Sequence, residues 1–425
     1  MGRRKVPDLY RAPFPLYTVK VDPKTGLVIT AGGGGASKTG IKNALHFLGL
    51  GMSGGQFTAT LLHTHDTETR ATMNMALGGD VIAAGQDGSC CLMRFRRKEE
   101  KEGRKAAATE GGSSEQGGTR RRAGRGAREG ASGAAGGDTK EDTPQIFVEG
   151  VGEVQSDLNP QDPLQKVVRF SPDLSLLLVG GTDGHIRVWE YPSLKEKYDF
   201  KAHEGEVEDL DISEDNKHLV TVGRDLACSL WCGTQLNMSL DWSRALPQVA
   251  ERTYRYQACR FGRVDDQEEA RRLYTVQIPH KRDRKPPPCY LTKWDASNFL
   301  PMLVAPCGTE VISCLAVSDS GTYLGLGTVT GSVAVYIAFS LQKLYYVKES
   351  HGIVVTDVCF LPDSAQGQLM RGNHEAAMLS VAVDSRCQMH TVRSRWSLPL
   401  WLLLVLGGLL VLGAVLLQLL LPGAL

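Results

Sequence analysis

The sequence has no dominant charge, no C-x-x-C pair and no apolar stretch near its N-terminus. Its 425 residues carry 48 basic and 47 acidic side chains, a formal net charge of +1, so no global electrostatic field draws the chain to nucleic acid. The ten cysteines lack the spacing of a zinc site or a disulfide scaffold, which favours buried free thiols in a reducing compartment. The opening MGRRKVPDLYRAPFPLY has no apolar core, which excludes a secretory signal peptide.

Motifs for covalent chemistry are also missing: the sequence shows no paired carboxylates in a catalytic setting and no cofactor fingerprint. Gly51 to Gly55 matches G-x-S-x-G by letter, but no helix pattern follows, so we expect a hairpin turn there. His63 and His65 share one face of a strand, yet no third ligand follows at a characteristic spacing, and we expect a structural or surface role. The soluble part is therefore predicted to be a binding platform.

One long apolar run is present, at the C-terminal end. No charged residue occurs from 396 to 425, and Leu400 to Leu421 is rich in leucine. As a helix this run would rise about 33 Å, which matches a hydrocarbon core of roughly 30 Å, so we expect a single transmembrane helix. Arg393 and Arg395 precede it. Basic flanks stay cytosolic, which predicts a cytosolic N-terminal part, a short lumenal tail at 422–425 and, from the short span, the endoplasmic reticulum membrane.

Repeats organise the soluble part. Asp183 and Asp225 lie 42 residues apart, as do Trp189 and Trp231, within the similar stretches VVRFSPDLSLLLVGGTDGHIRVWE and LDISEDNKHLVTVGRDLACSLWC. A period of about 40 to 45 residues with four short strand patterns and a terminal tryptophan is typical of a propeller blade. His203 stands where such a repeat has its Gly-His start, and we expect it to hydrogen-bond within its blade.

Weaker copies bring the number of units to seven. The fold class is thus predicted to be all-β: a seven-bladed WD-repeat-like β-propeller within residues 1–395, with the C-terminal transmembrane helix. Residues 96–142 break the pattern, because Lys, Arg, Glu, Gly, Ala and Ser dominate there. We expect a disordered insertion between blades two and three. Its basic cluster, TRRRAGRGAR at 119–128, is compatible with a nuclear or nucleic-acid patch, a solvated linker or a contact with anionic lipid.

A glycine-rich loop, AGGGGASKTGIKN, is the most unusual local feature. Gly32 to Thr39 fits the phosphate-binding pattern G-x-x-x-x-G-K-[ST] except that Ser37 replaces a glycine. The loop falls between two strands, where other blades have a Gly-x-Asp-Gly turn, whereas a phosphate loop opens a helix. We therefore reject nucleotide binding by this loop alone. Two interpretations remain: a long flexible turn, or a loop whose backbone approaches a partner closely.

The propeller pattern, the loop AGGGGASKTGIKN, the blade GGTDGHIRVW, the run AFSLQKLYYVKESHGIVVTDV and the apolar C-terminus together resemble the endoplasmic-reticulum exchange factors that activate the small GTPase of the COPII coat. The resemblance spans nearly the whole chain. It implies that the propeller binds this GTPase, the secretion-associated Ras-related protein, and promotes GDP release and GTP loading without covalent chemistry. It also implies COPII coat assembly for transport to the Golgi, and coat or exit-site proteins as further partners.

Carried over by resemblance, Gly32 to Asn43 is the exchange loop. Ile41 and Asn43 are the side chains expected to contact the GTPase, and the rest of the site is Gly32, Gly33, Gly34, Gly35, Thr39 and Gly40. No cofactor is expected. The yeast relative's loop binds potassium, which makes potassium at the loop backbone the one candidate ion, although the Lys38 ammonium would disfavour it.

Two other classes of function stay open at this point. A DNA-binding transcriptional regulator, with the nucleus as a minor location, would use the basic cluster at 119–128 and bind in a salt-dependent way. A passive propeller scaffold for coat or cargo proteins would bind the GTPase equally well whatever its nucleotide.

Overall fold

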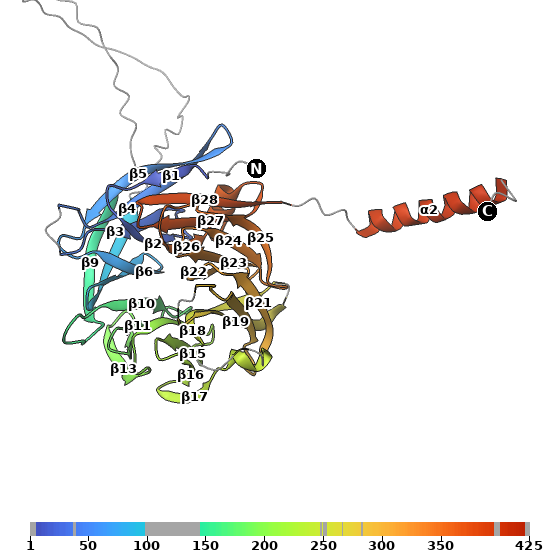
Figure 1. Cartoon of the computed structure of the whole chain (residues 1–425). Coiled ribbons are helices and arrows are strands. Elements are labelled where there is room, and N and C mark those ends of the chain that lie inside the picture. The colour runs from blue at the N-terminus through green and yellow to red at the C-terminus, as the bar shows by residue number, and fades with distance from the viewer. Residues whose placement is uncertain are drawn as a thin grey trace, which may run out of the picture.

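The computed structural model describes residues 6–36, 40–97, 145–246, 249, 253–265, 267–281, 284–394 and 400–420. Within that part, seven four-stranded sheets surround a central channel as a β-propeller (Figure 1). The first strand of each sheet lies beside the first strands of its two neighbours, so these strands line the channel. The prediction of an all-β, seven-bladed propeller is confirmed.

The strands are given blade by blade from the channel outward. Blade 1 contains β2 (Leu16–Val21), β3 (Val28–Gly32), β4 (Ala44–Ser53) and β5 (Gln56–Asp66); blade 2 contains β6 (Thr72–Gly78), β7 (Val81–Gln86), β8 (Ser89–Arg97) and β9 (Ile146–Gln155); blade 3 contains β10 (Gln165–Phe170), β11 (Leu176–Gly181), β12 (His185–Glu190) and β13 (Lys195–Lys201); blade 4 contains β14 (Val207–Ile212), β15 (Leu219–Gly223), β16 (Cys228–Cys232) and β17 (Gln235–Ser239).

The remaining elements follow in the same order. A 3-10 helix, η1 (Trp242–Ala245), precedes blade 5, which contains β18 (Tyr254–Val264), β19 (Gln267–Pro279), β20 (Cys289–Asp295) and β21 (Pro301–Gly308); blade 6 contains β22 (Ile312–Val317), β23 (Tyr323–Thr328), β24 (Val333–Ile337) and β25 (Gln342–Val347); blade 7 contains β26 (Val355–Phe360), β27 (His374–Ala382), β28 (Arg386–Arg393) and β1 (Asp8–Arg11), with α1 (Ala365–Arg371) between its first two strands; α2 (Leu400–Leu420) comes last.

Blade 7 closes the ring by combining the two ends of the propeller sequence. Its outer strand is the N-terminal β1, in which Tyr10 lies opposite Cys387 of β28. A single pass along the chain does not predict this pairing, because the two strands are more than 370 residues apart. The N-terminal strand thereby joins the first and last blades without any covalent link.

The hydrophobic core is divided among the seven spaces between neighbouring blades. In β3, Val28 packs between blades 7 and 1, whereas the next residue, Ile29, packs between blades 1 and 2. Side chains of a strand alternate between the two faces of its sheet, and here both faces are covered. This is why the inner strands read as continuous apolar runs rather than as alternating patterns.

The predicted position of the insertion needs correction. Arg96 and Arg97 belong to β8 and pair with Phe147 and Ile146 of β9, since long charged side chains are tolerated on the exposed side of an outer strand. The break therefore falls inside blade 2, between its third and fourth strands, and not between blades two and three. Residues 98–144, with the basic cluster at 119–128, lie outside the described residues.

The connections between strands divide between two faces of the propeller, because neighbouring strands run antiparallel. One face carries the connections between second and third strands, such as 33–43 and 224–227, and those between blades; we name it the loop face. The opposite face carries α1 and the ends of β8 and β28 at Arg97 and Arg393; we name it the exit face.

Helix α2 coincides with most of the apolar run predicted to cross a membrane, and its 21 residues include no charged side chain. The side chains at 400, 401, 403 and 417–420, and residues 421–425, lie outside the described residues. Among the residues that are described, no helix combines the length and apolar character needed to cross a membrane.

Candidate functional site

The loop face of blade 4 shows how an ordinary turn is held in this propeller. Both nitrogens of the His203 ring are hydrogen-bonded: Nδ1 lies 3.0 Å from Asp225 Oδ1, and Nε2 lies 2.8 Å from Thr221 Oγ1. Trp231 Nε1 donates to the same Thr221 oxygen at 2.9 Å. Burial would raise the pKa of the Asp225 carboxyl, but hydrogen bonds from His203 and two backbone amides lower it overall. The expectation that His203 bonds within its blade is confirmed.

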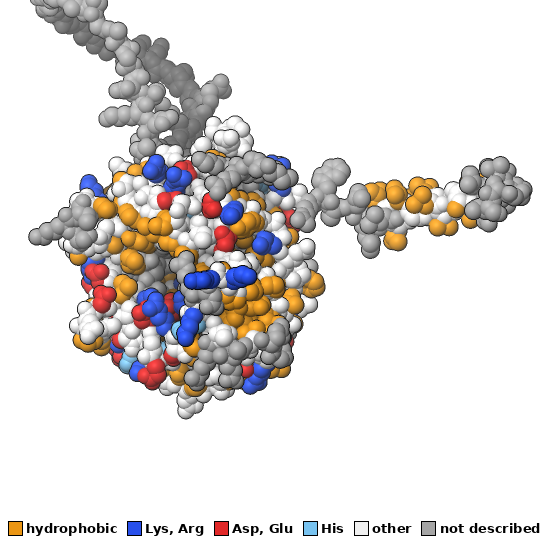
Figure 2. All heavy atoms as spheres, viewed as in Figure 1, with side chains coloured by type: hydrophobic (Ala, Val, Ile, Leu, Met, Phe, Trp, Pro, Cys, Tyr) orange, Lys and Arg blue, Asp and Glu red, His pale blue; other side chains and the backbone are white. Residues whose placement is uncertain are grey.

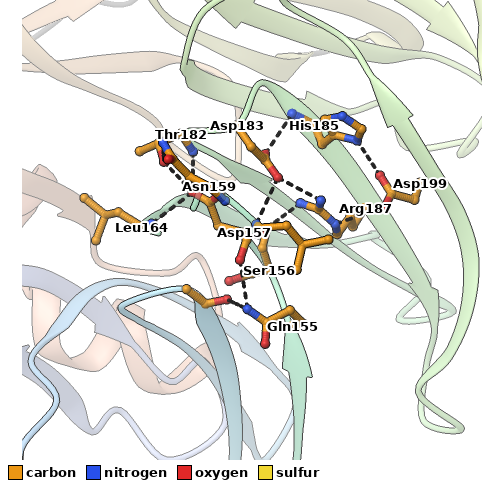
Figure 3. Close-up of polar contacts among 12 residues, drawn as sticks. Gln155, Ser156, Asp157, Asn159, Leu164, Thr182, Asp183, His185, Arg187 and Asp199 are labelled. Atoms are coloured by element: carbon orange, nitrogen blue, oxygen red, sulfur yellow. Dashed lines mark hydrogen bonds and ion pairs between the residues drawn. The ribbon is translucent and has the colours of Figure 1, made fainter. Parts of the chain in front are cut away.

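Blade 3 holds its turn with an arginine instead (Figure 3). The buried Arg187 guanidinium donates to Asp183 Oδ2 at 2.8 Å, to Asp199 Oδ2 at 3.2 Å and to the Ser156 carbonyl at 2.9 Å. The neighbouring Asp157 carboxylate, which is buried, accepts from the Thr182 amide and hydroxyl, each at 2.6 Å. The hydrogen bonds and ion pairs drawn in this turn all join parts of the same fold, so the network is structural.

Blade 1 has a longer connection at the same place, residues 33–43 between β3 and β4. Its base lies tightly against the entry to blade 1: the Gly33 amide donates to the Pro15 carbonyl at 3.0 Å, and a Cβ atom at Gly32 would lie 1.9 Å from that oxygen. Glycine is required at Gly33 as well, where φ is +147° and a Cβ would lie 2.1 Å from Asn43 Oδ1.

Asn43 closes this loop from inside. Its side-chain oxygen accepts from the Gly35 amide at 2.8 Å, and its Nδ2 donates to the Gly35 carbonyl at 3.1 Å and to the Glu68 carbonyl at 2.9 Å. The residue is only 2% exposed. Its hydrogen-bonding groups hold the loop from within, because Asn43 immediately precedes β4 and faces inward.

Ile41 is the apolar side chain that this loop presents to solvent. It is 39% exposed and follows Gly40, whose φ of +75° turns the chain with nothing within 4 Å of the position where a Cβ would be. Gly34 and Gly35 are half-buried. Thr39, a predicted site residue, lies outside the described residues together with 37 and 38. The structure thus brings the glycines, Ile41 and Asn43 into one loop, in which Asn43 is buried and Ile41 is exposed.

The rejection of a phosphate-binding loop agrees with this geometry. The loop is followed by β4, a ten-residue strand, and among the described residues no helix begins at the loop. The Gly33 and Gly35 amides already donate to Pro15 and Asn43, although a phosphate would need such amides to point at it.

The described part of the loop does not fit a potassium ion well. Asn43 Oδ1 and the Gly35 carbonyl, two of its oxygen atoms, each accept a hydrogen bond, and the Asn43 carbonyl accepts from the Thr67 amide at 3.0 Å. Asn43 already joins the two ends of the loop, so a cation is not needed for that purpose. We derive no step through potassium.

The two remaining sequence motifs, the glycines at 51–55 and the histidine pair, lie in a hairpin turn and on a strand. Gly54 and Gly55 form the hairpin turn between β4 and β5 with φ of +58° and +76°, as expected for Gly51 to Gly55. His63 and His65 lie on β5, where burial lowers the pKa of both imidazoles. Within the described residues, no group of three or more His, Cys, Asp or Glu side chains is placed to hold a metal.

Sequence reasoning missed a charged network in the central channel, where the inner strands enclose a cavity of about 170 Å³. Asp357 accepts from Thr18 and Lys20 at 2.8 and 2.6 Å, and Asp209 pairs with Arg169 and Arg260. Acidic and basic side chains also gather near the centre of the face in Figure 2. These residues lie on the inner strands of five different blades, so no local sequence pattern connects them.

Known proteins resemble the chain in two ways. Residues 163–190 and 194–232 match the family described as WD domain, G-beta repeat. Over 427 aligned residues, which cover 100% of both chains, the sequence is 58% identical to the guanine nucleotide-exchange factor SEC12 of Mus musculus and 57% identical to that of Rattus norvegicus. It is 28% identical to the SEC12-like protein 2 of Arabidopsis thaliana over 236 residues, 55% of this chain and 53% of that protein.

Proposed function

The chain belongs to the family of SEC12 guanine nucleotide-exchange factors, and on that premise we propose that it acts at the endoplasmic reticulum membrane on the small GTPase of the COPII coat. It promotes GDP release and GTP loading without covalent chemistry, and the loaded GTPase then initiates coat assembly. The observation that carries the proposal is the 58% identity over the full length of both chains.

The exchange step follows from differential affinity. A GTPase retains GDP through its phosphate loop, a magnesium ion and its switch segments. A protein that binds the nucleotide-free form more tightly than the GDP form shifts the equilibrium toward release, by no more than that difference in affinity. No group of the exchange factor needs to form or break a covalent bond.

The loop at 33–43 is suited to this step because its base is in place before the partner arrives. Asn43 fixes the base through three hydrogen bonds, so this part of the loop loses little entropy on binding. Ile41, which is exposed, supplies an apolar wedge that packs better against an open nucleotide site than against a closed one. Asn43 is a positioning residue and Ile41 is the contacting side chain.

Helix α2 is the proposed membrane anchor. The sequence has no charged residue from 400 to 421, and a helix over that full run would rise about 33 Å, which is close to the thickness of the hydrocarbon core. Arg393 and Arg395 lie within seven residues of the start of α2 on the propeller side, which supports a cytosolic propeller. Retention of the full chain in membranes at alkaline pH, and its loss on truncation after residue 394, would test this assignment.

The exchange function is tested with the full chain in liposomes, by following release of a fluorescent GDP analogue from the COPII GTPase. Wild type should accelerate release, Ile41→Ala should lose most of the acceleration, and Leu236→Ala should keep it. Leu236 is an exposed aliphatic side chain on β17 of blade 4 and is a matched control. Binding of the GTPase with equal affinity in its GDP-bound and nucleotide-free forms would instead establish a passive scaffold.

A further inference from the structure

The exit face is tied to the position of α2 by a short segment. Strand β28 ends at Arg393 and α2 begins at Leu400. The six residues between them span at most roughly 25 Å even when fully extended. If α2 is anchored as proposed above, on which this inference rests, the exit face near Arg393 cannot lie farther than that from the lipid surface.

An exposed apolar surface lies beside this point. Leu369 of α1 is 76% exposed, and Met52 at the end of β4 is 54% exposed. A Cβ atom at Gly372 would lie 3.6 Å from Met52 Cε, so Met52 adjoins the end of α1. His374, two residues farther on, pairs with Arg393 across β27 and β28. Leu369 and Met52 therefore lie next to the place where the chain leaves the propeller.

Helix α1 is held so that Leu369 points outward. Ser364 caps its N-terminus by accepting from the Gly367 amide, and Gly367 is buried. Met370 packs against the turn at Gly26, where a Cβ atom would lie 2.6 Å from its sulfur. The opposite side of α1 thus contacts the fold, and Leu369 has no role in the core.

The charges around this surface suit an anionic membrane. Lys24 lies in the same turn as Gly26 and is exposed, and Arg393 is exposed at the end of β28. On α1 itself, the Arg371 guanidinium is paired with Asp363 at 2.8 Å. Each basic side chain near a membrane with acidic lipids contributes about 1 kcal/mol of attraction, which adds to the burial of the two apolar side chains.

We propose that Leu369 and Met52, flanked by Lys24 and Arg393, contact the cytosolic lipid surface and hold the propeller with its exit face toward the membrane. The contact can be weak in itself, because the anchor keeps the surface at a high effective concentration. Met52 lies near the end of β4, and the exchange loop precedes the start of the same strand. The loop then lies about 30 Å farther from the lipid.

Site-directed fluorescence on the full chain tests this orientation. All ten cysteines are unpaired and Cys232 is the exposed one, so Cys232→Ser gives a background for single labels. An environment-sensitive dye is attached through Leu369→Cys, Met52→Cys or Val329→Cys. Val329, on the loop face between β23 and β24, is also exposed and is the control. The protein is reconstituted in phosphatidylcholine liposomes with and without phosphatidylserine, and nitroxide-bearing lipids serve as quenchers.

The proposal expects at least threefold stronger quenching at 369 and 52 than at 329, further increased by phosphatidylserine, and loss of most of the quenching at 52 when Leu369→Asp is added. Equal quenching at all three positions, in chains that resist alkaline extraction, would overturn the contact and leave the anchor intact. Extraction of the labelled chains at alkaline pH would overturn both.

Discussion

Blades 1 and 4 solve the same structural problem in different ways. In each, a buried polar side chain holds the connection between the second and third strands. In blade 4 the turn is short, and Asp225 contacts His203 and the Glu204 amide at 3.0 Å each. In blade 1 the connection spans 33–43, and the Asn43 amide, rather than a carboxylate, joins its two ends.

The two connections differ in the part that is fixed by hydrogen bonds. In blade 4 the accepting carboxylate of Asp225 lies within the turn itself, and its hydrogen bonds fix the turn against its own blade. In blade 1 Asn43 fixes only the base of the loop, at Gly35 and Glu68, and leaves Ile41 exposed beyond it. The same strand framework therefore holds a short turn in one blade and, in the function proposed above, a partner-contacting loop in the other.

The largest effect is expected from Asp225→Ala. His203, whose side chain is 0% exposed, would lose its carboxylate partner inside the fold. Hydrogen bonds to a charged group contribute about 1.5–3 kcal/mol each, so loss of those that Asp225 accepts from His203 and the Glu204 amide should cost about 3–5 kcal/mol. Thermal unfolding of the full chain in detergent, followed by tryptophan fluorescence, should show this loss, whereas GDP release per folded molecule should be unchanged. A parallel loss of exchange would remove the distinction between the two blades.

Asn43→Ala should affect both properties. It leaves the Gly35 amide and carbonyl and the Glu68 carbonyl without their partner, at a cost of about 2–4 kcal/mol in unfolding free energy. GDP release should slow by on the order of tenfold, equivalent to about 1.4 kcal/mol. Ile41→Ala, in contrast, should slow release with no change in the unfolding midpoint. Identical behaviour of the two variants would contradict their different roles.

Gly33→Ala should cost about 1–3 kcal/mol, because its φ of +147° is unfavourable for alanine and the new Cβ would meet Asn43. Gly40→Ala is the matched control: its φ is also positive, +75°, but nothing lies within 4 Å. Comparison of the two unfolding midpoints separates crowding against Asn43 from backbone strain alone. A greater loss at position 40 would argue against the tight base of the loop.

Blade 1 contains a buried histidine, His46, and acidification should therefore lower the free energy of unfolding. His46 of blade 1 faces the Tyr10 hydroxyl at 2.6 Å, and burial lowers its pKa to about 4. Below its ordinary pKa of about 6.5 the unfolded chain binds the proton first, so stability is full above that pH and is lost as pH falls toward 4. Between pH 6.5 and 5 the loss should reach about 2 kcal/mol.

Urea unfolding at pH 7.5 and 5, with wild type beside His46→Gln, measures this contribution. The variant should lose less stability on acidification than wild type. It should still lose some, because burial also lowers the pKa of His390, to about 3. Equal pH dependence of the two proteins would show that His46 does not contribute.

The smallest effect is expected from Lys201→Ala. Lys201 pairs with Glu204 at 2.5 Å, but both side chains are largely exposed, and exposed pairs contribute about 0–1 kcal/mol. The fold should therefore tolerate this change at the end of β13 in blade 3, while Asp225→Ala in blade 4 is damaging. A midpoint shift as large as that of Asp225→Ala would mean that the buried network is not what holds this turn.

Local patterns were enough for much of this protein. The spacing of Asp183, Asp225, Trp189 and Trp231 predicted the blades, because each repeat is one four-stranded unit with its own turns. The loop was placed correctly for the same reason, since its position between two strands is set by neighbours in sequence. The apolar run at 400–421 likewise predicted a helix.

The remaining features depend on residues far apart in the sequence. Closure of blade 7 by β1, the break inside blade 2 rather than after it, and the bond from Asn43 to Glu68 all require knowledge of which strands pair. The sequence by itself determined the repeat, the loop and the apolar helix, because these are encoded over a few tens of residues. Only the tertiary structure decided that Asn43 turns inward, that Ile41 stays exposed, and that Leu369 and Met52 adjoin Arg393, because these arrangements arise when separate blades pack together.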